Sequence, residues 1–539
     1  MMSLLQRSVL VGIVLQVCFV AQAIAFTAGW HTQQHAALAL RRERSSTTEL
    51  AFFRKLFRSN KKQSAPSAPE PAPTRSKRIS VEPADLCVIG GGVSGLVAAA
   101  EAAKKSPKAK IILLEAEEML GGRVQSDKTP DGFILDRGFA VFIEDYPVAR
   151  TVLDYEQLKL KPFLPGALVK ITETSSLVRV ADPLRQPEEL LTALFAPVGT
   201  FVDKMRLLLL IQHALSTPVE NLFTENETDT ETELKERWGL SDTFIDRFFR
   251  PFLEGIYLAP LNEQSSRMFN FIFKMFSTGA ATLPAGGMGA IAEQLASKAK
   301  EAGVDLRTNS PVANVRKEED GYVITTEIGK TTIRAKNVVV ATDGAAAQKL
   351  LSQINGLEEL AGKPEQPQRQ VMCMYYAFDA PAPVEEPILI LNGVIGKRGT
   401  PECPVNNACF PSVINEGYAP EGKGLCSVTI LKDMMDAYEG KEGDLDKAVR
   451  EQLGTWFPEI KNDILSKWEL KGTYKIKNAQ PAQLGGPFPA SINGGRSPTT
   501  YRGVLPQGLL VCGDHMATAT LNGALESGLR AGEAAAKLL

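Results

Sequence analysis

The sequence predicts an α/β fold in which segments far apart in the chain build one largely parallel sheet. Three observations predict it: a strand, a glycine-rich turn and a helix over residues 86–105, a buried strand with a small-residue turn over residues 337–344, and a second strand-turn-helix unit over residues 508–528. Short apolar runs without alternation are typical of strands buried on both faces of a parallel sheet. Helical periodicity over residues 146–295 and strand-like runs over residues 370–501 predict an interwoven second, mixed α+β domain.

The first unit has the glycines that a bound dinucleotide requires. The apolar run Leu86–Ile89 leads into Gly90-Gly91-Gly92-Val93-Ser94-Gly95, and a helix follows. Gly90 permits the tight turn, Gly92 lets the backbone approach a pyrophosphate, and Gly95 lets the helix pack closely on the sheet. The helix N-terminus directs N–H groups at the phosphates. The predicted binding residues of this unit are Gly90, Gly92, Ser94 and Gly95.

A second apolar run, Ile111–Leu114, places an acid where a ribose would bind. It ends in Glu115, which lies twenty residues beyond Gly95. An acid at this spacing accepts hydrogen bonds from ribose hydroxyls. Gly122 then lets the backbone pass near a cofactor, and Arg123 supplies a cation beside its phosphates. These features together predict dinucleotide binding; the alternative is a glycine-rich turn with a surface glutamate.

Composition excludes several function classes. The 539 residues include 60 basic and 62 acidic side chains, so no charge excess points to nucleic acid. Seven cysteines without C-x-x-C pairs and four histidines argue against a disulfide framework and a metal site.

The amino terminus has targeting chemistry. Residues 1–25 have the form of a signal peptide, with Arg7, an apolar core too short to span a membrane, and small residues at its end. Residues 26–80 are first basic and hydroxyl-rich, then rich in Pro, Ala and Ser, and are predicted to be a transit peptide and linker. The junction Ala25-Phe26 resembles the two-part presequence of plastid proteins in algae with secondary plastids. We predict plastid import, with secretion as the alternative.

The glycine-rich turn, Glu115 and Gly121-Gly122-Arg123 at this spacing resemble the flavin amine oxidase superfamily, which also holds phytoene desaturases, carotenoid isomerases and protoporphyrinogen oxidases. The resemblance implies bound FAD. Residues 132–138 fit the hairpin in which that superfamily has an aspartate, here Asp136, near the flavin. Residues 139–142 depart from the aromatic-and-histidine patterns of some amine oxidases, which disfavours a simple amine substrate.

Two later segments extend the resemblance. After a Pro-x-Gly-Gly-Met turn that starts at Pro284, the superfamily has a strand whose backbone flanks the adenine or ribose, and Val312 is the matching position. The carboxyl-terminal Gly-Asp turn resembles the closing motif: its acid would accept from ribityl hydroxyls, and the following helix N-terminus would face the N1–C2=O edge of the flavin. The residues so implied are Val312, Gly513, Asp514, Asn522, Gly523 and Ala524.

The resemblance implies a Rossmann-like FAD-binding domain interwoven with a mixed α+β substrate domain. The FAD-binding domain would comprise residues 84–140, 284–345 and 503–539. The substrate domain would comprise a helical part, residues 141–283, and a sheet, residues 346–502. In the helical part we predict helices over residues 204–215, 241–253 and 265–277, with the acidic segment 220–236 as a solvated loop.

The implied reaction is a two-electron oxidation of a C–N or C–C bond, with hydride passing to flavin N5. No catalytic residue is predicted, because the flavin carries the electronics. His515 lies beside Asp514, where it either approaches the flavin or packs near the turn. Cys512 matches no attachment motif, so non-covalent FAD is predicted.

The substrate is predicted to be an apolar isoprenoid or tetrapyrrole, with peripheral membrane association as an option. The alternatives are a small amine, a non-redox isomerisation and a flavin-binding assembly factor without turnover. The apolar face of helix 265–277 is either ordinary core or the wall of a substrate tunnel. The candidate lining is Phe244, Phe248, Phe249, Phe252, Met268, Phe269, Ile272 and Met275, with Arg247, Arg250, Arg267 and Lys274 placed to meet lipid headgroups.

Overall fold

The structure is a computed structural model that describes residues 81–138, 141–182, 185–186, 189–327, 331–484 and 496–539. The predicted presequence, residues 1–80, and the departure from the amine oxidase pattern at Phe139-Ala140 lie outside the described residues. Among the described residues, no helix combines the length and the apolar character that crossing a bilayer requires.

The first of two seven-stranded sheets confirms the α/β class. Its order is β10-β2-β1-β13-β12-β11, and β19 pairs with β13. The strands are β1 (Val81–Ile89), β2 (Ile111–Leu114), β10 (Asp305–Arg307), β11 (Val312–Glu318), β12 (Gly321–Thr326), β13 (Thr332–Val340) and β19 (Leu509–Val511). β10, β2, β1, β13 and β19 run parallel, so strands from three distant segments end at one edge of the sheet.

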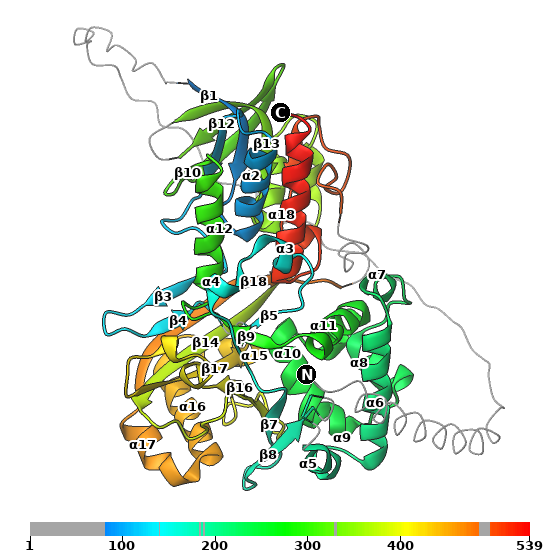
Figure 1. The fold of residues 1–539 in the computed structure, drawn as a ribbon, viewed down its shortest axis with the longest axis vertical. Coiled ribbons are helices and arrows are strands. Elements are labelled where there is room, and N and C mark those ends of the chain that lie inside the picture. The colour runs from blue at the N-terminus through cyan, green and yellow to red at the C-terminus, as the bar shows by residue number, and fades with distance from the viewer. Residues whose placement is uncertain (1–80, 139–140, 183–184, 187–188, 328–330, 485–495) are drawn as a thin grey trace, which may run out of the picture. The chain divides into compact units, whose positions relative to one another are not determined.

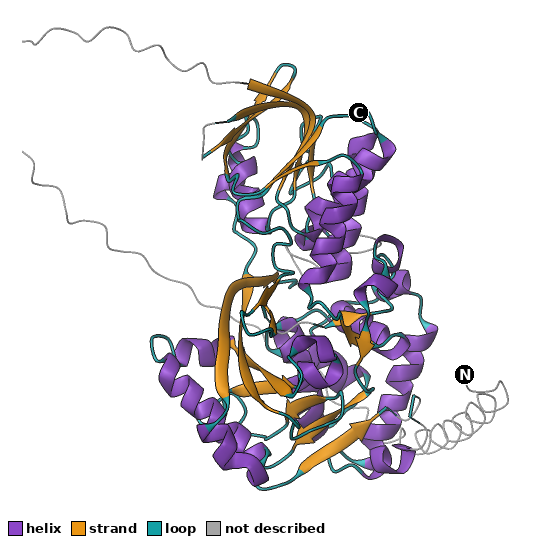
Figure 2. Ribbon diagram, turned by 60° about the vertical axis from the view of Figure 1, so that its left-hand side comes forward, coloured by secondary structure: helices purple, strands orange, loops and turns teal. Residues whose placement is uncertain are grey.

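Helices cover one face of this sheet (Figure 1, Figure 2). α2 (Val93–Lys105) lies between α12 (Gly289–Glu301) and α18 (Leu521–Ala536), and all three share a core with alternate residues of β1 such as Leu86 and Val88. The other residues of β1, including Cys87, pack in a second core with α13 (Gly344–Leu351). Both faces of β1 are therefore buried, as its unbroken apolar run predicts.

β13 is longer than the sequence pattern predicts. The buried strand predicted within residues 337–344 forms only the second half of this nine-residue strand, which begins at Thr332. Its first half pairs antiparallel with β12, while its whole length pairs in parallel with β1.

The second seven-stranded sheet has the order β18-β14-β17-β16-β15-β7-β8. Its strands are β7 (Gly166–Lys170), β8 (Leu177–Ala181), β14 (Gln368–Asp379), β15 (Leu389–Asn392), β16 (Val405–Cys409), β17 (Lys423–Leu431) and β18 (Glu469–Pro481). One longer helix, α16 (Glu442–Trp456), lies between β17 and β18 in the chain. β18 escapes sequence prediction because most of its side chains are polar and partly exposed.

The three helices predicted in the helical part are present, with one irregularity. They are α6 (Phe201–Ser216), α11 (Ser266–Thr278), and a continuous run made of α9 (Asp242–Phe244), a π-helical turn (Ile245–Phe249) and α10 (Arg250–Tyr257). A shorter helix, α5 (Leu190–Phe195), precedes α6.

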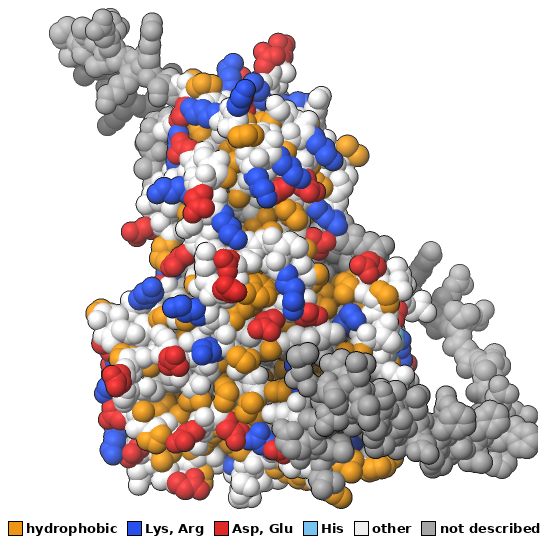
Figure 3. Space-filling view, viewed as in Figure 1, with side chains coloured by type: hydrophobic (Ala, Val, Ile, Leu, Met, Phe, Trp, Pro, Cys, Tyr) orange, Lys and Arg blue, Asp and Glu red, His pale blue; other side chains and the backbone are white. Residues whose placement is uncertain are grey.

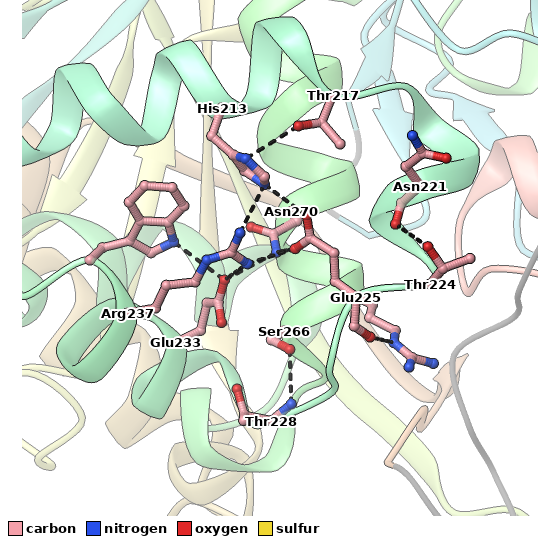
Figure 4. A network of polar contacts seen from close by, with 12 residues as sticks. His213, Thr217, Asn221, Thr224, Glu225, Thr228, Glu233, Arg237, Ser266 and Asn270 are labelled. Atoms are coloured by element: carbon pink, nitrogen blue, oxygen red, sulfur yellow. Dashed lines mark hydrogen bonds and ion pairs between the residues drawn. The ribbon is translucent and has the colours of Figure 1, made fainter.

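The prediction that residues 220–236 form a solvated loop is wrong. This segment contains α7 (Val219–Leu222), α8 (Thr230–Thr232) and part of a second π-helical turn, and Glu233 and Leu234 are buried. Two of its acids are bound by a cation: Arg237 Nη1 lies 2.6 Å from Glu225 Oε2 and 2.8 Å from Glu233 Oε1 (Figure 4). Paired acids of this kind leave no signal in composition or periodicity.

Candidate cofactor and substrate sites

A cavity of about 600 Å³ opens at the carboxyl ends of β1, β2 and β13. This volume lies within the range of about 300–1,000 Å³ that is usual for ligand sites, and the edge where parallel strands end is where open α/β sheets bind ligands. Ten of the thirteen predicted cofactor-binding residues line it. They are Gly90, Gly92, Ser94, Glu115, Gly122, Arg123, Val312, Gly513, Asp514 and Ala524.

The three glycines of the first turn have three different surroundings. Gly90 has φ +110°, and a Cβ atom there would lie 2.7 Å from the carbonyl oxygen of Ala341. A Cβ on Gly95 would lie 2.0 Å from the carbonyl oxygen of Gly90, so this glycine lets α2 approach the strand. Gly92 has an ordinary φ of −69°, and a Cβ there would meet no atom within 4 Å. Gly92 therefore borders open space, which is the cradle a pyrophosphate needs.

Glu115 is held in place by the backbone. Its Oε2 accepts a hydrogen bond from the Gly91 N–H at 2.6 Å, and its Oε1 accepts one from the Glu117 N–H at 2.9 Å. A carboxylate has about four acceptor positions, so both oxygens retain capacity for ribose hydroxyls.

Arg123 and Asp514, which are 391 residues apart, form a bidentate ion pair with both nitrogen–oxygen distances at 2.8 Å. The side chain of Arg123 is 35% exposed and that of Asp514 is 8% exposed. Burial disfavours the charged guanidinium, but Asp514 and Asp343 outweigh this and hold the pKa of Arg123 above its usual value. The pair joins the Gly-Gly-Arg segment to the carboxyl-terminal turn across the cavity.

The remaining predicted residues fasten α2 and α18 together or to their surroundings. The Ser94 hydroxyl, which also borders the cavity, donates to the carbonyl oxygen of Ala524 at 2.8 Å. Asn522 accepts from the Val148 N–H at 3.0 Å, and a Cβ on Gly523 would lie 2.0 Å from the carbonyl oxygen of Thr518. Gly95, Asn522 and Gly523 are absent from the cavity wall.

Two expectations from the sequence meet buried surroundings outside this cavity. Asp136 accepts hydrogen bonds from Ser126, Met288 and Tyr418, and burial raises the pKa of its carboxyl group. It fixes the turn that precedes α12 and does not line the cavity. His515 packs against Tyr501, with ring centroids 6.0 Å apart, so of the two alternatives stated above the structure favours packing near the turn over approach to the flavin. Burial lowers the pKa of His515 to about 4.

A second, apolar cavity of about 180 Å³ lies between the helical part and the second sheet. Phe248 and Phe252 of the predicted lining face it, and Leu207, Ile211, Phe273 and Phe276 join them. The two cavities are neighbours: Gln480, which lines the first, donates from Nε2 to the carbonyl oxygen of Ile256, which lines the second, at 3.0 Å.

The rest of the predicted lining is ordinary core. Six side chains are buried within the hydrophobic cluster and do not line the cavity: Phe244, Phe249, Met268, Phe269, Ile272 and Met275. The cations predicted to meet headgroups are engaged by the protein. Arg250 pairs with Asp246, Glu231 and Glu254. Arg247, Arg267 and Lys274 donate to backbone carbonyl groups.

Residues 93–536 match the family model of the flavin containing amine oxidoreductases. The chain belongs to this family. The protein is accordingly a flavin-dependent oxidoreductase, and the cavity at the sheet edge has the expected position for its cofactor.

Relatives of known name fall in several branches. The chain is 24% identical over 375 residues to the carotenoid 3,4-desaturase of Haloarcula japonica, a match that covers 63% of this chain and 74% of the desaturase. It is 27% identical over 184 residues to the coproporphyrinogen III oxidase of Propionibacterium freudenreichii, a match that spans only 33% of either protein.

Solved structures share the fold. A protein of Exiguobacterium sp. 255-15, provisionally described as a protoporphyrinogen oxidase, superposes with a TM-score of 0.61 at 18% identity and covers 85% of this chain and 99% of that one. Cyclohexylamine oxidase of Brevibacterium oxydans superposes with a TM-score of 0.58 at 16% identity, covering 84% of this chain and 99% of that one. Identities this low show the fold alone.

Proposed function

We propose that the protein is an oxidoreductase with non-covalent FAD that removes a hydride from an apolar isoprenoid- or tetrapyrrole-sized substrate in the plastid. The observation that carries the proposal is the pair of neighbouring cavities. One is lined by backbone turns, an acid and an arginine, and the other is lined mainly by phenylalanine and aliphatic side chains. The hydrogen bond from Gln480 to Ile256 joins their walls.

The residues of the first cavity fit FAD. The open space at Gly92 and the N-terminus of α2 suit the pyrophosphate, Glu115 suits a ribose, and the backbone at Val312 suits the adenosine end. The N-terminus of α18, capped by Thr520, lies at the other end with Asp514. FAD bound there supplies a two-electron acceptor.

The chain's own contribution is to bind, orient and exclude water. The Arg123–Asp514 ion pair fixes the Gly-Gly-Arg segment to the carboxyl-terminal Gly-Asp turn in the cavity wall. The phenylalanine side chains of the second cavity keep water away from the reacting carbon, which favours hydride transfer over side reactions.

Cys512 supports non-covalent attachment. It is fully buried within the hydrophobic core, and burial raises the pKa of its thiol to about 12. A buried, protonated thiol is a poor nucleophile toward a flavin. Denaturing the purified protein should release all yellow colour; colour that stays on the polypeptide refutes this part of the proposal.

The second cavity favours an apolar molecule over a cationic amine. Its carboxylate, Asp182, is paired with Arg185 at 2.9 Å, so the acid's charge is already neutralised. An amine oxidase on a small amine is the second candidate, because cyclohexylamine oxidase shares the fold. A non-redox isomerase or an assembly factor would have the same cofactor cavity.

Anaerobic mixing of the oxidised flavoprotein with a phytoene-type polyene, protoporphyrinogen and a panel of amines tests these candidates. We expect loss of flavin absorbance with an apolar compound and recovery in air. Bleaching by an amine alone overturns the substrate class and leaves the flavin assignment intact. Bleaching by none of them, with dithionite still effective, favours the assembly factor.

Plastid import has its own test. Residues 1–80 fused to a fluorescent protein should deliver it to the plastid of an alga with secondary plastids, and replacing Phe26 should divert it. Secretion of the unaltered fusion refutes import.

A further inference from the structure

The apolar side chains that the protein leaves exposed are concentrated on α5 and α6, which lie on one side of the helical part (Figure 1). Five of the thirteen exposed large hydrophobic side chains of the described residues are on these two helices. They are Phe195 at 77%, Phe201 at 60%, Val202 at 52%, Leu215 at 46% and Leu209 at 44% exposed. A concentration of this kind marks an interaction surface, whereas scattered single residues do not.

Helical geometry explains why α6 exposes apolar residues. At 100° per residue, the buried side chains Asp203, Leu210 and Ala214 fall on one face. The opposite face carries Phe201, Val202, Leu209 and Leu215, together with the half-buried Met205 and Leu208. The exposed Gln212 and Ser216 also lie on this outward face, so it is largely but not wholly apolar, and the protein covers only the opposite face.

Two polar networks clamp α6 in this orientation. At its start, Asp203 accepts hydrogen bonds from Thr200 and from the N–H and hydroxyl of Ser241, the latter two at 2.7 and 2.8 Å. At its end, His213 lies 3.0 Å from Glu225, which Arg237 and Asn270 also bind (Figure 4). Because buried polar groups are costly to unpair, α6 cannot rotate to hide its apolar face.

Lys204 clamps α5 as well. Its Nζ donates to the carbonyl oxygens of Leu194 and Ala196, at 2.5 and 2.6 Å, where α5 ends. The cations of α6 are engaged by the protein: Lys204 binds the two carbonyl groups of α5, and Arg206 donates to the carbonyl oxygen of Gly239. The apolar character of the exposed face and its place beside the apolar cavity, and not its charge, match the surface of a bilayer.

The same helix borders the apolar cavity. Leu207 and Ile211 line that cavity together with Phe248 and Phe276, while residues one or two positions away face outward. We propose that α5 and α6 lie in the surface of a lipid bilayer, with the face Phe195, Phe201, Val202 and Leu209 inserted, so that an apolar substrate passes from the bilayer past α6 into this cavity. The inference rests on the proposed function in taking the cavity as the substrate chamber.

A position-specific depth measurement on the full-length holoprotein tests the inference. The six cysteines of the described residues are all buried, so with Cys18→Ser a new surface cysteine can be labelled selectively. An environment-sensitive fluorophore is placed by Leu209→Cys, and in a control by Leu465→Cys on α17 (Lys461–Ser466), which is 36% exposed. The probe membrane is a phosphatidylcholine–phosphatidylglycerol vesicle carrying nitroxide-labelled lipid.

We expect blue-shifted, nitroxide-quenched emission from position 209 and none from position 465. Phe201→Glu with Leu209→Glu should lower the vesicle partition coefficient at least about tenfold, whereas Leu465→Glu should not. An unquenched label at position 209 on vesicle-bound protein overturns the inference. A second outcome also overturns the inference: the label at position 209 is shielded in the absence of vesicles, and light scattering shows that the protein is a dimer. A second copy of the chain then covers the face.

These readouts need no turnover. Failure of every apolar compound to bleach the flavin, when delivered in detergent, would refute the proposed substrate and leave the depth result standing.

Discussion

Gly92→Val separates cofactor binding from folding. The φ and ψ of Gly92 are −69° and 173°, which any L-residue adopts, and a Cβ there meets no protein atom within 4 Å. The substitution should therefore leave the stability of the protein without flavin within about 1 kcal/mol of the parent, because restricting the unfolded chain offsets the poorer helix N-cap that valine makes. The two added methyl groups fill the space beside the α2 N-terminus. Losing even one charge-assisted hydrogen bond to the pyrophosphate, worth roughly 1.5–3 kcal/mol, weakens FAD binding about ten- to 150-fold.

The assay is the ratio of flavin to protein absorbance after purification, together with thermal unfolding of flavin-free protein. Gly443→Val is the matched control, because that glycine also faces open space but lies on α16. Gly95→Ala is the opposite case: its Cβ would lie 2.0 Å from the Gly90 carbonyl oxygen, so α2 must move, at a cost of about 1–3 kcal/mol. A Gly92→Val protein that purifies fully yellow refutes the cofactor assignment, and one that unfolds several degrees earlier refutes the open-space interpretation.

Three further outcomes are expected. Glu115→Ala should weaken FAD binding by roughly 1.5–3 kcal/mol in a titration of flavin-free protein; an unchanged Kd would place the ribose elsewhere. Arg123→Ala should destabilise the holoprotein by about 1–3 kcal/mol in denaturant unfolding, because it leaves the Asp514 carboxylate unpaired; the loss is no larger because the partial exposure of Arg123 weakens the pair. The double variant Arg123→Ala, Asp514→Ala should recover part of the lost stability, since it leaves no unpaired carboxylate. The free energy of unfolding should fall by up to roughly 3 kcal/mol as the pH drops from about 6.5 to about 4, because over this range the imidazole of His515 binds a proton in the unfolded chain but not in the folded protein. His515→Phe should flatten this dependence of stability on pH.

The proposed cofactor cavity could be predicted from sequence because several of its predicted residues have a local reason to be there. Gly90 needs a positive φ, Gly95 needs close contact, and Glu115 follows a buried strand. Local rules of this kind survive folding unchanged. What each polar residue binds is not local: the pairing of Arg123 with Asp514 joins segments 391 residues apart, so their proposed roles toward phosphate and ribityl groups remain predictions.

The substrate side was harder to predict because the helices there are irregular. Regular periodicity puts Phe244, Phe248 and Phe252 on one face, four residues apart. Their rings do stack in one row across the π-helical turn Ile245–Phe249, with neighbouring centroids 6.0 Å apart, but Phe244 is buried in the core while Phe248 and Phe252 reach the cavity. A π-helical turn inside an α-helix often marks a functional site, but nothing in a single sequence announces it.

Charge patterns misled for a related physical reason. The acidic segment 220–236 looks solvated, yet Glu225 and Glu233 are bound by Arg237, and both belong to the network that holds the end of α6 (Figure 4). On the face seen in Figure 3, by contrast, charges of both signs are interspersed, so this face has no patch of one sign that would suit nucleic acid.

The polar networks and the exposed apolar face of α6 belong together. Burying one large apolar side chain stabilises a fold by about 1.5–3 kcal/mol, so leaving Phe201, Val202 and Leu209 in water forgoes a substantial gain. A helix with apolar side chains on opposite faces would turn or collapse inward unless something held it. The buried Asp203 at one end and the partly buried His213–Glu225 pair at the other supply that restraint. Because the fold itself holds this apolar face outward, we expect another apolar surface to cover it. A bilayer that dissolves the proposed substrate would cover the face and would lie next to the cavity lined by Leu207 and Ile211.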